Sequence, residues 1–168
     1  MSAFEGRRKS AALPQLHVMR QRKNPMSDQI ELVRVFNDNS QLAELYRSVA
    51  LGSRSPQQIA TAFQNSKYTI FALKGGQLVG AGRAFGDEVD CAVICDLAVS
   101  PDLQGTGIGK RILEALKEQV RHHLRIILYA NPGKEDFYLR LGFSKMKTAM
   151  MTSYLLSSDV GRQIGFIE

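Results

Sequence analysis

Apolar residues recur along the chain with strand spacing and then with helix spacing, beginning near residue 30. The segment 30–35 predicts a strand, and the segment 40–49 predicts a helix because its apolar residues recur every three or four positions. Asp38 is expected to cap this helix. A second helix is predicted from Ser55, since Ser55 and Gln58 form a capping box with a proline between them.

Three strands are predicted next. Tyr68–Leu73 and Gln77–Phe85 are separated by a Lys-Gly-Gly sequence, which predicts a tight hairpin. Glu88–Val99 follows and carries apolar residues on both faces, as expected of a central strand that is covered on both sides.

The remaining pattern alternates between helix and strand. A helix is predicted from about Thr106, and Leu124–Tyr129 then predicts a buried strand parallel to the previous one, because a helix separates the two. A short helix up to Leu141 and two strand-like segments, 143–147 and 150–155, complete the chain. The order β-α-α-β-β-β-α-β-α-β-β predicts a single α/β (α+β) domain with a mixed central sheet of about seven strands.

Composition limits the class of protein. The 168 residues, 44% hydrophobic and 23% charged, suit one soluble globular domain that buries its core without disulfides or metal. Cys91 and Cys95 are too few for a disulfide scaffold or a zinc site, so we expect no metal and a reducing, cytoplasmic compartment. No apolar run approaches the roughly 20 residues of a membrane span, and no membrane partner is expected.

The net charge of +6 is concentrated in the first 25 residues. Residues 1–25 carry six basic side chains and one acidic side chain, whereas the rest of the chain carries 16 basic and 15 acidic ones. A nearly neutral body without Trp gives little support for nucleic-acid binding. The leader is expected to lie outside a domain of residues 26–168. It is an upstream stretch translated ahead of Met26, a basic interaction arm, or part of a homodimer contact.

A glycine-rich loop joins the predicted central strand to the next helix, with the sequence Gln104-Gly105-Thr106-Gly107-Ile108-Gly109-Lys110. Three glycines within five residues let several backbone N–H groups converge on one anion, and the start of a helix adds its positive dipole. The spacing fits neither a Walker A loop nor the dinucleotide fingerprint Gly-x-Gly-x-x-Gly. The alternative is an ordinary strand-to-helix turn whose glycines serve packing.

The loop matches the pattern Gln/Arg-x-x-Gly-x-Gly/Ala and resembles the acetyl-CoA loop of the GNAT N-acetyltransferases. A second motif, from Asp136 to Phe143, is similar to the Phe-Tyr-x-x-x-Gly-Phe signature that ends the CoA-binding region of that family. The order of elements over residues 28–156 is also that of the GNAT fold. The resemblance implies a single acyl-CoA N-acyltransferase domain with acetyl-CoA as cosubstrate.

The resemblance also implies which residues bind acetyl-CoA. Backbone N–H groups of the glycine loop would hold the pyrophosphate, and the edge of the central strand would pair with pantetheine. A backbone N–H of Leu97 or Ala98 would stabilise the oxyanion. Asn131 matches an asparagine that contacts pantetheine, and its alternative is a helix cap. The implied cofactor-binding residues are Leu97, Ala98, Val99, Gln104, Gly105, Thr106, Gly107, Ile108, Gly109, Lys110, Asn131 and Tyr138.

Two residues are candidates for proton transfer. Tyr138 matches the family tyrosine that protonates the leaving thiolate, and its alternative is a core or hydrogen-bonding tyrosine. Strict alternation places Asp96 on the same face as Ala92 and Ile94, inside an apolar strand. Burial is expected to raise the pKa of Asp96 and to suit it to accept the proton of the amine. The alternative is a buried carboxylate that is satisfied by backbone or loop hydrogen bonds.

Other polar residues are weaker candidates. Glu88 and Asp90 are alternative bases, although side chains at the start of a strand are more often just solvated. His122 and His123 are expected to be an exposed cationic pair at a helix end, without a role in metal binding or catalysis.

These residues predict an N-acetyltransferase in which a primary amine attacks acetyl-CoA directly in a ternary complex. A small amine is preferred as acceptor over a protein lysine or N-terminus, and residues 50–55 and 145–153 are expected to select it. A non-catalytic acyl-CoA sensor is the competing class. The segment around Asp96 is similar to glucosamine-phosphate N-acetyltransferases, which carry glutamate where this chain has Cys95.

Overall fold

The computed structural model describes residues 29–49, 51, 54–155 and 157–167, so the predicted extension at 1–25 lies outside the described residues. These residues form one mixed sheet in the order β1-β2-β3-β4-β5. The strands are β1 (Ile30–Val33), β2 (Tyr68–Lys74), β3 (Gln77–Gly86), β4 (Cys91–Val99) and β5 (Arg125–Leu128). The helices are α1 (Asn39–Ser48), α2 (Pro56–Gln64), α3 (Ile108–Gln119), α4 (Glu135–Leu139) and α5 (Ser158–Gln163). The α/β class is as predicted.

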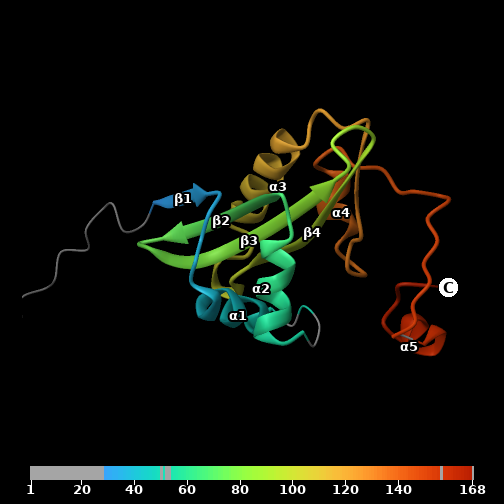
Figure 1. Ribbon diagram of the computed structural model, residues 1–168, viewed down its shortest axis with the longest axis horizontal. Helices are drawn as coiled ribbons and strands as arrows, with labels where there is room; N and C mark the ends of the chain where they lie inside the picture. Colours follow the sequence, from blue (N-terminus) through green and yellow to red (C-terminus); the bar gives the residue numbers. More distant parts are fainter. Residues whose placement is uncertain (1–28, 50, 52–53, 156, 168) are drawn as a thin grey trace, which may run out of the picture.

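Helices cover both faces of the sheet (Figure 1). α3 packs on one face through its buried stripe, and α1 and α2 pack on the other. The residues that fill these two layers include Ile108, Ile112 and Leu116 from α3 and Leu42, Leu45, Tyr46, Ile59 and Phe63 from α1 and α2. Among the described residues, no helix is long and apolar enough to cross a membrane.

Local signals in the sequence set the bounds of several elements. Asp38 accepts hydrogen bonds from the backbone N–H groups of Ser40 and Gln41 at the start of α1. The capping box of Ser55 and Gln58 is formed at the start of α2. The hairpin between β2 and β3 turns through two glycines with φ values of 56° and 82°. These predictions are confirmed.

β4 contains a bulge at Asp96. The backbone there has a φ of 54°, in the left-handed region that residues other than glycine rarely enter. Asp96 and Leu97 together lie opposite a single residue of β3, Gly82, because the pairings on either side are Ala81 with Ala98 and Arg83 with Cys95.

The bulge changes the face that each side chain of β4 occupies. Ile94 and Leu97 both pack in the layer of α3, although strict alternation places them on opposite faces. Asp96 instead bonds to Arg54, which precedes α2. The predicted placement of Asp96 beside Ala92 and Ile94 is therefore wrong, because one inserted residue breaks the period of two.

β5 runs parallel to β4, as predicted, but only over four residues. Cys91–Ile94 pairs with Arg125–Leu128, and β4 then continues to Val99 without this neighbour. The ends of the predicted strand Leu124–Tyr129 lie outside this pairing, and both terminal side chains are exposed. The last residues of β4 consequently present an open edge beside the glycine loop.

The sheet has fewer strands than the pattern predicts. The segments 143–147 and 150–155 form no strand, and most of their side chains are exposed. A strand needs a neighbour for its backbone N–H and C=O groups, and these segments pair with no strand in the described part of the chain. α5 follows this tail and is a helix that the pattern does not predict (Figure 1).

β4 begins at Cys91 rather than at Glu88. Asp87 accepts hydrogen bonds from the backbone N–H groups of Val89, Asp90 and Cys91. These bonds curl residues 87–90 into a turn, as aspartate side chains commonly do. The predicted start of the strand is therefore three residues too early.

The close approach of α3 to β3 gives a first prediction. A Cβ atom at Gly82 would lie 2.9 Å from Leu116 Cδ1 and 3.0 Å from Ile112 Cγ2. We expect Gly82→Ala to lower the free energy of unfolding, measured by urea denaturation, by about 1–3 kcal/mol, because α3 must shift. The double variant Gly82→Ala with Leu116→Ala should lose less free energy of unfolding than the sum of the two single variants. Strict additivity would contradict a contact between the added methyl group and Leu116.

Candidate active site

A cavity of about 700 Å³ lies where β4 and β5 separate. Its wall combines the end of β4, the glycine loop and α4. Thr106 and Ile108 are not part of the wall, because the Thr106 hydroxyl donates to the carbonyl of Leu103 and Ile108 is buried in the core. The other predicted residues are brought together there, namely Asp96, Leu97, Ala98, Val99, Gln104, Gly105, Gly107, Gly109, Lys110, Asn131 and Tyr138.

The glycine loop has the shape of an anion site. Gly105 and Gly107 have φ values of 78° and 90°, and no heavy atom lies within 4 Å of the place where their Cβ atoms would be. Gln104 Nε2 donates to the carbonyl of Val99 at 3.1 Å and so braces the loop. No side chain of the described residues caps the first turn of α3, which leaves its N–H groups for a ligand. These features fit a bound anion, as the glycine pattern predicts.

Sequence reasoning missed part of the wall. Lys134 and Arg140 add two cations to that of Lys110. Lys134 precedes α4, and Arg140 follows α4 within the Phe-Tyr motif, so the motif itself could have drawn attention to them. Leu51 lies in the predicted acceptor segment 50–55, and Phe137 lies in the Phe-Tyr motif. The apolar residues that were missed come together only through folding and include Val49, Leu103, Leu128, Tyr129 and Phe166.

Asn131 lines the cavity and caps no helix. α4 begins after Lys134, whose side chain makes no capping hydrogen bond, and Asn131 contributes only its backbone carbonyl, to the N–H of Lys134 at 3.0 Å. The helix-cap alternative for this residue is therefore wrong, and Asn131 is part of the cavity wall.

Asp96 is clamped by side chains from three parts of the fold. Arg54 donates through Nη1 to Oδ2 at 2.8 Å and through Nη2 to Oδ1 at 2.6 Å. Arg83 Nε donates to Oδ2 at 2.6 Å. The hydroxyl of Tyr46 on α1 donates to the main-chain carbonyl of Asp96. Asp96, which lines the cavity, thus also stabilises the fold.

The clamp sets the protonation state of Asp96. Burial favours the neutral acid, yet the hydrogen bonds and charges of Arg54 and Arg83 outweigh it and lower the pKa of Asp96. The expectation of a raised pKa is therefore wrong. The structure instead shows a largely buried carboxylate held by two arginine side chains, whereas the alternative expected donors from the backbone or a loop.

Tyr138 faces the cavity from α4 and is half-buried. Its ring packs edge-on against Phe137 and Phe143, with centroid distances of 5.0 and 6.0 Å. Burial raises the pKa of Tyr138, so its phenol stays protonated at neutral pH and can donate a proton. Cys95 also faces the cavity, and burial raises the pKa of its thiol, which disfavours the nucleophilic thiolate.

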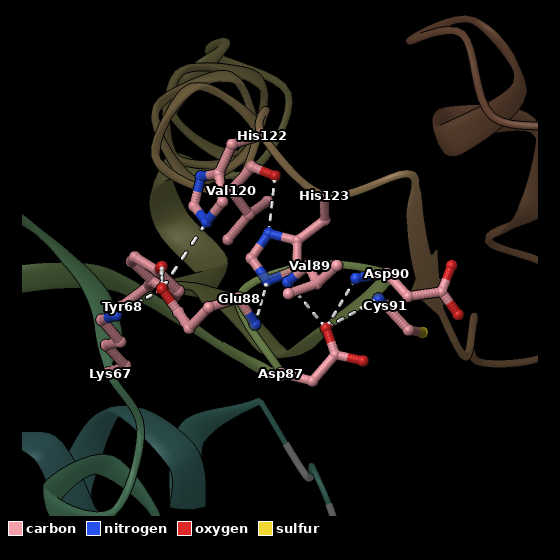
Figure 2. A network of polar contacts seen from close by, with 10 residues as sticks. All are labelled: Lys67, Tyr68, Asp87, Glu88, Val89, Asp90, Cys91, Val120, His122 and His123. Carbon is pink, nitrogen blue, oxygen red and sulfur yellow. Dashed lines mark hydrogen bonds and ion pairs between the residues drawn. The ribbon is translucent and has the colours of Figure 1, made fainter.

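The alternative bases lie outside the cavity wall, at the turn between β3 and β4. Glu88 accepts hydrogen bonds from Lys67 and Tyr68 (Figure 2), and Asp90 accepts one from Arg125. The hydrogen bond from Lys67 Nζ to Glu88 is also an ion pair. Both carboxylates are therefore engaged in holding this turn.

His123 belongs to the same network and is buried, so the predicted exposed pair is wrong for this residue. Its Nε2 accepts from the backbone N–H of Glu88 at 3.0 Å, and its Nδ1 lies 3.0 Å from the carbonyl of Val120 (Figure 2). Glu88, His122 and His123 lie close enough together to share a metal ion. Both ring nitrogens of His123 already have partners, however, and Lys67 already neutralises Glu88. The cluster is thus a support for the turn.

Comparisons with known proteins point to one family. The family of acetyltransferase (GNAT) domains matches residues 33–154. The uncharacterized N-acetyltransferase ycf52 of Porphyra purpurea is 33% identical over 130 residues, which cover 70% of this chain and 75% of that protein. The chloroplastic serotonin N-acetyltransferase 2 of Oryza sativa subsp. japonica is 32% identical over 113 residues, covering 64% and 56%.

A solved structure shows the same fold. Glucosamine-6-phosphate N-acetyltransferase from Arabidopsis thaliana superimposes with a TM-score of 0.60 at 16% sequence identity. The match covers 76% of this chain and 99% of that chain. At this identity the likeness concerns the fold and leaves the acceptor open.

Replacing Asp96 tests the clamp. Asp96→Asn leaves two guanidinium groups facing each other without a counter-charge, so we expect the free energy of unfolding at pH 7 to fall by about 3 kcal/mol. The exposed pair of Asp159 and Arg162 provides a control, and Asp159→Asn should change it by less than about 0.5 kcal/mol. Chemical denaturation measures both.

The difference in free energy of unfolding between the wild type and Asp96→Asn should depend on pH, because the pKa of Asp96 is lowered. A carboxyl whose pKa is depressed on folding stabilises the fold above its unfolded pKa, and this stabilisation is lost as the pH falls through the folded pKa. The free energies of unfolding of the wild type and Asp96→Asn should therefore become more similar as the pH falls. A gap that widens as the pH falls contradicts the account.

Proposed function

Because the chain belongs to the GNAT family and is an acetyl-CoA-dependent N-acetyltransferase, we propose that its acceptor is a small primary amine that attacks the thioester directly in a ternary complex. One observation carries this proposal: a single cavity joins the glycine loop, the open edge of β4 and Tyr138. Donor and acceptor can therefore be held together. The relative from rice, named a serotonin N-acetyltransferase, supports a small amine.

Binding of the donor falls to the backbone of the loop and to nearby cations. The N–H groups at the start of α3 hold the pyrophosphate, and Lys110, Lys134 and Arg140 lie in the same wall to balance phosphate charge. The edge of β4 from Leu97 to Val99 takes the pantetheine arm as an added strand. Acetyl-CoA supplies an acetyl group activated as a thioester, whose carbonyl carbon accepts the amine nitrogen.

Proton transfer falls to Tyr138. As the C–N bond forms and the C–S bond breaks, the phenol gives its proton to the departing sulfur and is reprotonated from solvent. A backbone N–H of Leu97 or Ala98 stabilises the oxyanion. The pKa of Asp96 is lowered by its arginines, so this carboxylate is a poor base. The amine therefore enters in its neutral form or loses its ammonium proton to water. As the C–N bond forms, the nitrogen gives a further proton to solvent, which balances the proton that Tyr138 gives to the sulfur.

A covalent route through Cys95 has little support. Burial raises the pKa of this thiol, and among the described residues no histidine hydrogen-bonds to it. The relative from rice is named as chloroplastic, so the chloroplast is a candidate compartment beside the reducing cytoplasm that the cysteine content predicts.

Thiol release from acetyl-CoA in the presence of a panel of amines tests the proposal. At least one small amine should be acetylated, with the product identified by its mass. Tyr138→Phe should lower kcat by about 10²–10⁴-fold and leave acetyl-CoA affinity unchanged, because only the proton donor is removed. Tyr154→Phe is the matched control, since the side chain of Tyr154 is fully exposed.

Three outcomes contradict the proposal. Unchanged turnover in Tyr138→Phe removes the tyrosine from proton transfer. Acetylation of peptide amines alone assigns the acceptor to proteins. Tight binding of acetyl-CoA without turnover of any amine or peptide indicates a sensor.

A further inference from the structure

Given the proposed function, we propose that the small amine carries a carboxylate next to its amino group, and that Arg54 binds this carboxylate while Asp96 orients the amine. The inference deepens the proposed function and rests on it. It follows from the charge, the hydrogen bonds and the apolar surroundings of the Asp96 clamp.

The charge of the clamp is positive. Asp96 lines the cavity and carries one negative charge, and Arg54 and Arg83 bond to it without lining the cavity themselves, so the three residues together carry a net charge of +1 beside the cavity. Asp96 is also the only acidic residue that lines the cavity among the described residues, whereas three cations line it. The cavity therefore lacks a free carboxylate for a second ammonium group, and an anion is favoured.

Hydrogen-bond capacity remains on both sides of the ion pair. Each carboxylate oxygen has two lone pairs, and among the described residues Oδ1 of Asp96 accepts one bond, from Arg54 Nη2. Arg54 has five N–H donors, of which two are used in its bonds to Asp96. An amine can thus donate to Oδ1 while a carboxylate accepts from the remaining donors of Arg54.

Exposure distinguishes the two arginines. The side chain of Arg54 is 32% exposed, whereas that of Arg83 is 14% exposed and also bonds to Ser66. Arg54 is therefore the more accessible of the two guanidinium groups beside Asp96, and Arg83 supports Asp96 from within the fold. An α-amino acid has its amine and its carboxylate on one carbon, which matches a neighbouring carboxylate and guanidinium.

The nearby wall favours an apolar body for the acceptor. Val49 and Leu51, which follow α1, line the cavity together with the aromatic side chain of Tyr138. An amino acid with an aromatic or aliphatic side chain fits these surfaces. Polyamines and basic peptides bring further cations to a site that is already positive, so they are disfavoured.

Matched amines that differ only in a carboxylate test the inference. The pairs are 5-hydroxytryptophan with serotonin and tyrosine with tyramine, and kcat/KM is calculated per concentration of free amine to remove differences in amine pKa. In the wild-type protein the carboxylate-bearing member should be favoured at least about tenfold, as expected for a charge-assisted hydrogen bond. Arg54→Gln should reduce this ratio about tenfold or more.

Controls separate binding of the carboxylate from damage to the fold. Arg121→Gln is the matched control, because Arg121 is exposed on the surface and pairs only with Glu118 among the described residues, and it should leave the ratio unchanged. Thermal melting and acetyl-CoA affinity show whether Arg54→Gln is folded. If Arg54→Gln is unfolded, the inference is judged by the wild-type ratio of kcat/KM values alone.

The outcomes are distinguishable. A wild-type ratio below one, a preference for spermidine, or an unchanged ratio in folded Arg54→Gln overturns the inference and leaves the proposed function standing. Absence of thiol release with every amine overturns the proposed function, and this inference with it.

Discussion

The left-handed backbone of Asp96 is the constraint on which the site depends. This conformation costs a residue other than glycine about 1–3 kcal/mol, and it persists because neighbouring groups fix it. Tyr46 holds the main-chain carbonyl, while Arg54 and Arg83 hold the side chain. The resulting bulge turns one carboxylate toward the cavity and away from the layer of α3. It also directs the last residues of β4 past the end of β5, where the donor is proposed to bind.

The parts of this site that the sequence reveals are contiguous in the chain. The glycine loop and the Phe-Tyr motif each lie within eight residues or fewer, so their chemistry is visible without the fold. The same holds for the caps at Asp38 and Ser55 and for the stripe of α3. Their local patterns and their tertiary roles agree, as expected of a sequence that specifies one fold.

The parts that sequence reasoning missed depend on distant contacts. In the sequence, Asp96 is an acid within an apolar strand. Its contacts with Arg54, 42 positions away, and with Tyr46, 50 positions away, are what show that it is clamped and ionised. The segments 143–147 and 150–155 have strand-like sequences, yet a strand forms only where another strand offers its edge. His123 is buried because the turn at Glu88 folds onto it.

The polar residues of the cavity thus have different roles. Asp96 supports the bulge, Tyr138 is left as the proton donor, and Cys95 remains a neutral thiol. This division requires both substrates to be bound before the acetyl group moves. Initial rates measured while acetyl-CoA and an active amine are varied together test it most directly. Intersecting double-reciprocal lines are the predicted result, and parallel lines, which signal an acetylated enzyme, would contradict it.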